Sequence, residues 1–99
     1  MKLLLVCAGG MSTSMLMKKL EAYAAKEGRE FEVAAIGVEE LVNPADKGYD
    51  VILLGPQIAY RKDKIVKKCQ GLPIDVIPMK DYGMGNCANI FAQMDALLG

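Results

Sequence analysis

The chain has 99 residues, 53% of them hydrophobic and 24% charged, a composition typical of a globular domain and not of a disordered segment. Its 12 basic and 12 acidic side chains give no net charge, which argues against nucleic acid as the main partner because phosphate binding needs a clustered basic excess. No apolar run approaches the roughly 20 residues of a membrane span, and the N-terminal apolar run is too short for a signal peptide. We therefore expect a single domain over residues 1–99 with no membrane span of its own.

The three cysteines, at positions 7, 69 and 87, are an odd number without zinc-like spacing, and the chain contains no histidine. This pattern favours free thiols in a reducing, cytoplasmic location and predicts no metal and no cofactor. The missing histidine also excludes every mechanism in which the chain supplies its own imidazole.

Strand and helix patterns alternate along the first half of the chain. The unbroken apolar run over Lys2–Val6 predicts a strand buried on both faces. Residues 30–36 alternate in hydrophobicity, which predicts an edge strand, and residues 38–48 predict a short, weak helix at best. Between them we expect a helix over Ser14–Glu27 whose apolar stripe contains Leu16, Leu20, Tyr23 and Ala24.

The second half repeats the alternation. Asp50–Leu54 is a second unbroken apolar run and so a central strand, after which Gly55-Pro56-Gln57 predicts a loop. A basic helix is expected over Tyr60–Cys69, and Leu72–Pro78, bracketed by prolines, predicts another edge strand. Residues 81–85 are expected to form a loop. The last helix should begin at Asn86 or Asn89 and bury Ile90, Phe91, Met94, Leu97 and Leu98.

Alternating strands and helices predict an α/β domain with a parallel four-stranded sheet in three layers. The two solid apolar strands should be central, so the simplest order is 2-1-3-4, the start of a flavodoxin-like fold. Right-handed crossovers then place the first and last helices on one face and the middle two on the other. Ligands of such sheets bind where the strand order reverses, here between the ends of the first and third strands, at Cys7 and Gly55.

The segment after Cys7 is typical of an anion-binding loop, or P-loop. Glycines let the chain curl so that backbone N–H groups converge on a tetrahedral anion, and the start of the following helix adds positive potential. The same field favours the thiolate form of a cysteine, and a thiolate beside an oxyanion cradle can accept and donate a phosphoryl group. The expected cradle residues are Ala8, Gly9, Gly10, Met11, Ser12, Thr13 and Ser14.

A lone cysteine at a strand end is most often a small packing residue. Cys7 differs in two respects: a glycine- and serine-rich loop follows it, and it lies where the strand order reverses, which we call the switch point. Both features favour a role for Cys7 as a nucleophile. Cys69 and Cys87 lie in helical patterns with no such loop, so we interpret both as packing residues.

The loop also invites comparison with cysteine-dependent phosphatases, whose motif is C-x5-R-[ST]. The sixth residue after Cys7 is Thr13, so the arginine that would stabilise the transferring phosphoryl group is absent. This difference favours a site that holds and relays a phosphoryl group over one that hydrolyses it. A phosphatase-like or arsenate-reductase-like enzyme, and a non-catalytic anion-binding regulatory module, remain the alternatives.

Other polar residues are expected around the switch point. Gln57, Tyr60 and Tyr82 are candidates to bind the phosphate or shape the approach of a partner, although loop structure alone explains each equally well. The segment Arg61–Lys68 carries five basic residues and one acid, Asp63. It is either a solvated helix face or a docking surface for an acidic partner or a membrane-proximal surface.

Three segments carry a family resemblance: VCAGGMSTSM at 6–15, ILLGPQIAY at 52–60 and DYG at 81–83. In this order and over essentially the whole chain, the sequence resembles the IIB component of the bacterial phosphoenolpyruvate-dependent sugar phosphotransferase system, lactose/cellobiose/chitobiose class.

The resemblance implies a fold, a site and partners. Cys7 matches the phosphorylated cysteine of the family, and the loop after it would hold the phosphate through main-chain amides. The partners implied are a IIA component, which donates the phosphoryl group from a phosphohistidine, and a membrane permease, IIC, which presents the sugar. The protein would be cytoplasmic and would meet the inner face of the membrane transiently through the permease.

Overall fold

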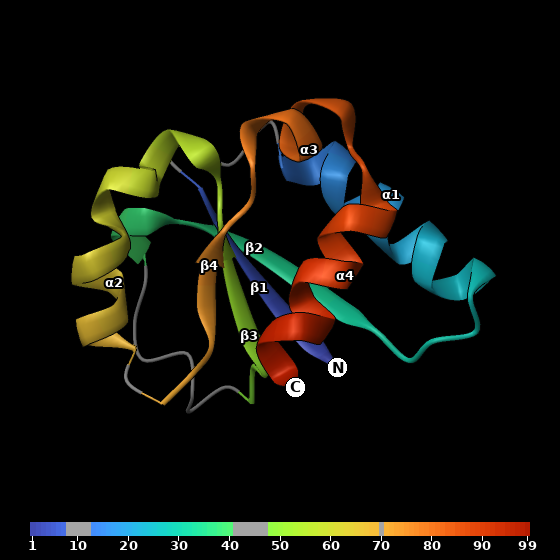
Figure 1. The fold of residues 1–99 in the computed structure, drawn as a ribbon, viewed down its shortest axis with the longest axis horizontal. Helices are drawn as coiled ribbons and strands as arrows, with labels where there is room; N and C mark the ends of the chain where they lie inside the picture. The colour runs from blue at the N-terminus through green and yellow to red at the C-terminus, as the bar shows by residue number, and fades with distance from the viewer. Residues whose placement is uncertain (8–12, 41–47, 70) are drawn as a thin grey trace.

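The computed structural model describes residues 1–7, 13–40, 48–69 and 71–99, which form a parallel sheet with helices on both faces (Figure 1). The sheet has four strands in the order β2-β1-β3-β4, as the sequence predicts. The strands are β1 (Lys2–Cys7), β2 (Glu32–Gly37), β3 (Val51–Leu54) and β4 (Ile74–Val76).

The two strands with unbroken apolar runs occupy the centre of the sheet. β1 lies between β2 and β3, with Cys7 opposite Gly37 on one side and Val6 opposite Leu54 on the other. Every residue of β3 is buried, whereas β2 is only partly buried along its length, as expected of an edge strand. Because all four strands are parallel, their carboxyl ends meet at one edge of the sheet.

Helices from opposite ends of the chain share one face of the sheet. α1 (Thr13–Lys26) and α4 (Cys87–Leu98) pack there, and their side chains join those of β1 and β3 in a hydrophobic cluster (Figure 1). The buried members of this cluster are Leu3, Leu5, Leu16, Leu20, Ala24, Val51, Leu53, Ile77, Ile90, Phe91 and Met94. The predicted placement of the first and last helices is therefore confirmed.

The opposite face is covered by η3 (Pro56–Arg61) and α2 (Lys62–Lys68), with Val38 of η1 (Val38–Glu40) at its margin. The cluster beneath them contains the alternate side chains of the central strands. Its buried members are Leu4, Val6, Ile52, Leu54, Ile58, Ile65, Cys69 and Ile74. Residues 41–47, within the weak helix predicted over 38–48, lie outside the described residues.

The segment after β4 differs from the prediction. The loop expected over residues 81–85 is wrong, because α3 (Met79–Met84) spans most of it and only Gly85 follows, in the left-handed conformation with φ of 63°. Pro78 precedes the helix, and Tyr82 packs against the cluster beneath α1 and α4. Gly83 disfavours a helix by about 1 kcal/mol relative to alanine, and this tertiary contact offsets it.

The basic helix also begins differently from the prediction. The loop expected at Gly55-Pro56-Gln57 is wrong beyond Gly55, since Pro56 starts the 3₁₀ helix η3, a first-turn position that suits its fixed φ. Ile58 interrupts η3 with φ of −116° and ψ of 21°, and α2 begins only at Lys62.

The C-terminal helix agrees with the prediction at its start and differs at its end. The Asn86 side chain caps α4 by accepting a hydrogen bond of 3.1 Å from the Asn89 N–H. Leu98 was expected to be buried but is 44% exposed, and Leu97, also expected to be buried, is half-buried against the core cluster. A helix turns by about 100° per residue, so adjacent leucines point in different directions. Within the described residues, no helix has the length and hydrophobicity needed to cross a membrane.

Candidate functional site

The ends of the two central strands meet where the sequence predicts a ligand site. Cys7 is the last residue of β1, and Gly55 directly follows β3. The Gly55 N–H donates a hydrogen bond of 2.9 Å to the Val6 carbonyl, so the two strand ends are held side by side. β2 and β4 lie outside them, which makes this the point where the strand order reverses.

The Cys7 side chain is buried, although it lies at the end of its strand. It is 2% exposed, and its Sγ donates a long hydrogen bond of 3.6 Å to the Ile36 carbonyl of β2. Burial alone does not separate a nucleophile from a packing residue, because Cys69 is 1% exposed. What distinguishes Cys7 is its position at the carboxyl end of a central strand.

The predicted phosphate-binding loop is described only at its end. Ala8, Gly9, Gly10, Met11 and Ser12 lie outside the described residues. Thr13 and Ser14 form the first turn of α1, which therefore begins six residues after Cys7, and the Ser14 side chain is exposed. This first turn contains no acidic residue, so no carboxylate of its own neutralises the positive end of the helix.

Two of the three predicted accessory residues come together over Gly55. A Cβ atom at this glycine would lie 2.8 Å from Oε1 of Gln57 and 3.8 Å from Cε2 of Tyr82. The side chains of η3 and α3 therefore approach the same strand end, and a residue larger than glycine there would displace Gln57. Tyr60 does not join them: it is 78% exposed, with the Arg61 guanidinium 5.6 Å from the centre of its ring.

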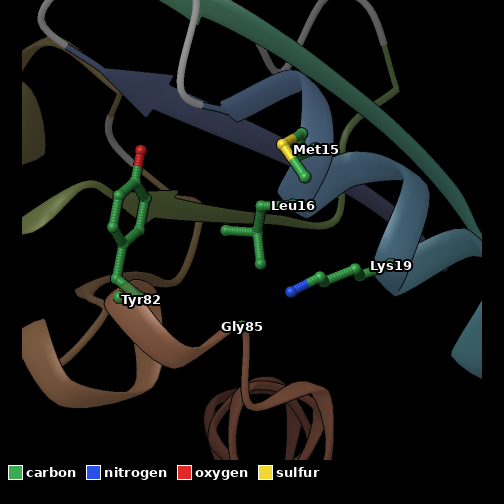
Figure 2. A pocket seen from close by; sticks show the side chains of 6 residues that line it. Met15, Leu16, Lys19, Tyr82 and Gly85 are labelled. Carbon is green, nitrogen blue, oxygen red and sulfur yellow. The ribbon is translucent and has the colours of Figure 1, made fainter.

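Tyr82 also forms one wall of a pocket of about 250 Å³ between α1 and α3. Figure 2 shows Tyr82 on one side of this pocket and Lys19 on the other, with the Lys19 amino group directed toward Gly85. The remaining lining residues are Met15, Leu16 and Gly83. Sequence reasoning missed Lys19 and Gly85, because a lysine on a helix and a glycine after one carry no signal that they face each other.

The other two thiols have surroundings that keep them protonated. Burial raises the pKa of Cys69 above its ordinary value, opposed weakly by the charge of Lys68. Burial likewise raises the pKa of Cys87, against the opposing charge of Lys19. Cys69 is buried and Cys87 half-buried, which agrees with their predicted role in packing. Among the described residues, no group of three or more histidine, cysteine, aspartate or glutamate side chains could hold a metal ion.

The fold and the strand ends define a class: an open parallel α/β domain with a cysteine at its switch point. Comparison with known proteins identifies the family. Residues 2–93 match the family model described as "PTS system, Lactose/Cellobiose specific IIB subunit". The chain therefore belongs to the lactose/cellobiose-specific IIB family, whose members are sugar phosphotransferase components that work with other components of the same system.

Individual relatives agree with this assignment. A galactose-specific EIIB component of Lactococcus lactis subsp. cremoris and a cellobiose-specific EIIB component of Lactococcus lactis subsp. lactis are each 41% identical to the chain, over 95% of it and 93% of the relative. An oligo-beta-mannoside-specific EIIB component of Bacillus subtilis is 34% identical, over 98% of the chain and 95% of the relative.

Solved structures agree as well. The cellobiose-specific IIB component of Borrelia burgdorferi has a TM-score of 0.76 and 32% identity, covering 99% of this chain and 91% of that one. The lactose-specific IIB domain of Streptococcus pneumoniae has a TM-score of 0.71 and covers 93% of this chain and 95% of that one. At 20% identity the second similarity concerns the fold alone.

Proposed function

We propose that this chain is the phosphoryl carrier of a sugar-transport phosphorelay and that Cys7 carries the phosphoryl group. The observation that supports this most is the position of Cys7: in a chain of the IIB family, it alone of the three cysteines ends a strand at the switch point. The donor is a phosphohistidine of a IIA component, and the acceptor is a sugar bound by a IIC permease. The single domain, residues 1–99, works in the cytoplasm and meets the membrane through the permease.

The proposed transfer consists of two displacements at phosphorus. The Cys7 thiolate attacks the phosphohistidine, so that an S–P bond forms, the N–P bond breaks and the donor histidine leaves with its nitrogen lone pair. A sugar hydroxyl then attacks the same phosphorus, the S–P bond breaks and the sulfur leaves as a thiolate, while the hydroxyl proton passes to solvent. The histidine that this chain lacks is supplied by its partner.

The surroundings of Cys7 have separate roles in this proposal. Residues Ala8–Ser14 hold the phosphoryl oxygens through backbone N–H groups, and the N-terminus of α1 adds positive potential. Gln57 and Tyr82, which meet over Gly55, limit the approach to the strand ends, and Tyr60 contacts the partner. No arginine follows Cys7 in the loop, so the phosphocysteine is kept until an acceptor arrives instead of being hydrolysed.

The sugar belongs to the class that the relatives' names describe. Those names specify galactose, cellobiose and oligo-beta-mannosides, and the family model specifies lactose and cellobiose. We propose a disaccharide of the cellobiose, lactose or chitobiose class.

The test is the intact mass of the chain after incubation with phosphoenolpyruvate, the general phosphotransferase components and a IIA component of the cellobiose class. We expect a gain of one phosphoryl group that is lost in Cys7→Ser and kept in the matched control Cys87→Ser. A phosphoryl group that persists in Cys7→Ser would contradict the assignment. Rapid hydrolysis of an aryl phosphate by the unmodified chain would support the phosphatase-like alternative instead.

A further inference from the structure

A second pocket, of about 380 Å³, lies on the face of the sheet covered by η3 and α2. Its lining combines basic, aromatic and aliphatic side chains: Val38, Tyr60, Arg61, Lys64, Ile65 and Lys68. We call this the basic pocket. Its described lining residues are all different from those of the pocket between α1 and α3.

The three cations of the basic pocket share one side of a helix. Arg61 precedes α2, and Lys64 and Lys68 follow it at spacings of three and seven residues, which places their side chains in a row. Among the described side chains, none of the three forms a salt bridge with an acidic residue. The neighbouring Lys62 does, at 3.4 Å from Asp75.

The described lining of the basic pocket contains no acidic residue. Asp63 of α2 and Glu39 of η1 are exposed, and neither is among the described residues that form the walls. Arg61, Lys64 and Lys68 therefore line a hollow that has no carboxylate on its described lining. This arrangement suits an anionic occupant.

The apolar part of the lining indicates what carries that negative charge. Of the lining residues, Ile65 is 4% exposed, whereas Tyr60 is 78% exposed. An exposed tyrosine beside an arginine is the combination enriched at the energetic centres of protein interfaces. Lipid-binding segments typically cluster about four to eight lysines and arginines, whereas the described lining of the basic pocket contains three.

The basic pocket begins next to the nucleophile. Val38 follows Gly37, which lies opposite Cys7 on the adjacent strand, and neighbouring strands are about 4.8 Å apart. A protein segment seated in the pocket therefore lies beside the carboxyl ends of β1 and β2, where phosphoryl transfer to Cys7 would take place.

We infer that the basic pocket docks an acidic surface segment of the phosphoryl-donor protein. This inference rests on the proposed function, because the donor is the IIA component of that relay. The three cations attract the carboxylates of the donor during encounter, and Tyr60 and Ile65 contact its apolar side chains once it is seated.

The test compares two double variants of equal charge change. Lys64→Glu/Lys68→Glu reverses both lysines of the basic pocket. Both are kept in the matched control Lys67→Glu/Lys80→Glu, whose residues are exposed and do not line the pocket. The measurement is the rate of phosphorylation of Cys7 by phospho-IIA at several donor and salt concentrations. We expect the pocket variant to raise the donor KM about tenfold or more, to weaken the salt dependence and to leave the maximal rate nearly unchanged.

The outcomes distinguish failure of the docking inference from failure of the proposed function. Equal donor KM values for the pocket variant and the unmodified chain would overturn the docking inference and leave the role of Cys7 intact. An equal effect of the two double variants would also overturn it, since only general charge would then matter. Failure of the unmodified chain to be phosphorylated would overturn the proposed function and the docking inference together.

A separate experiment tests whether the basic pocket binds a membrane surface instead. Vesicles of phosphatidylcholine and phosphatidylglycerol are sedimented with the unmodified chain and with Lys64→Glu/Lys68→Glu. We expect neither to bind. Binding that only the unmodified chain shows, together with unchanged transfer from phospho-IIA, would assign the basic pocket to lipid and overturn the inference.

Discussion

The two faces of the sheet are built differently, although both cover the same two central strands. On one face, α1 and α4 pack with three aromatic rings: Phe91 lies 5.1 Å from Tyr23 and 4.9 Å from Phe31, measured between ring centres. Arg29 stacks over the Phe91 ring and pairs with Asp95 of α4 at 2.6 Å. On the other face, a helix of seven residues covers an aliphatic cluster and leaves most of its cations without a salt bridge among the described side chains.

This difference separates stability from recognition. The packing of Phe91 against Tyr23 and the salt bridge between Arg29 and Asp95 hold α4 in place. These residues are far from Cys7 in the sequence. The α2 face contributes less to stability, and three of the four lysines of α2 form no salt bridge among the described side chains, which suits the docking role inferred above. Substitutions on the two faces should therefore have effects of different size and different kind.

The largest loss of stability is expected on the α1 and α4 face. Phe91→Ala removes a ring that is 2% exposed and contacts both Tyr23 and Phe31, so the free energy of unfolding should fall by about 3–5 kcal/mol. Urea unfolding followed by circular dichroism measures the change. Leu98→Ala on the same helix, where the side chain is 44% exposed, is the matched control and should cost about 0.5 kcal/mol or less.

A smaller loss of stability, with a loss of binding, is expected on the α2 face. Ile65→Ala should cost about 2 kcal/mol, near the low end for such substitutions, because this side chain borders an open pocket that water can fill. The same variant should raise the KM for phospho-IIA. Val66→Ala, at a half-exposed neighbour, should change neither quantity measurably. A stability loss as large as that of Phe91→Ala would contradict the contrast between the faces.

The smallest expected effect concerns the link between β4 and α4, and it depends on pH. Burial disfavours the ionised form of Asp75, but hydrogen bonds from Gln93 and from the Val76 N–H, with the charge of Lys62, outweigh it and lower the pKa of Asp75 below its ordinary value. The Asp75 carboxylate therefore binds a proton more readily in the unfolded chain than in the folded one. Asp75 therefore contributes stability above its unfolded pKa, and this contribution is lost as the pH falls through the folded value.

Gln93→Ala tests this link. It removes the hydrogen bonds from Nε2 to Asp75 and to the Val76 carbonyl, of 3.0 and 2.8 Å, and should cost about 1 kcal/mol near pH 7. The cost stays small because the Gln93 Oε1 atom, buried without a hydrogen-bond partner among the described residues, is removed too. The variant should also lose less stability than the unmodified chain between pH 6 and about pH 3. Parallel stability curves over this range would contradict the role of Gln93.

The sheet order could be predicted because the hydrophobicity pattern of each strand indicates how deeply that strand is buried. The apolar runs of β1 and β3 do not alternate, so these strands must be central, and the right-handed crossover rule then places the helices. α3 could not be predicted, because Gly83 and Gly85 are typical of a loop and the helix depends on the packing of Tyr82 against a distant cluster. Local signals do not contain that contact.

The same limit applies to the site. Cys7 could be placed from strand order alone, since the switch point follows from topology. The meeting of Gln57 and Tyr82 over Gly55 could not, because it depends on the start of η3 at Pro56 and on the unexpected helix α3. The basic residues in the segment 61–68 could be read from the sequence. Which of them line the basic pocket could not, because that depends on where α2 begins.

The hydrogen bond from Cys7 to the Ile36 carbonyl has a consequence for the proposed carrier. A thiolate and a phosphorylated sulfur both lack a proton to donate, so the proposed reaction requires this bond to be given up before Cys7 attacks the donor. The Ile36 carbonyl shares a peptide group with the Gly37 N–H, and Gly37 directly precedes Val38 of the basic pocket. In the proposed cycle, the protonated thiol is therefore the resting form, in which the Cys7 sulfur is hydrogen-bonded to the edge strand.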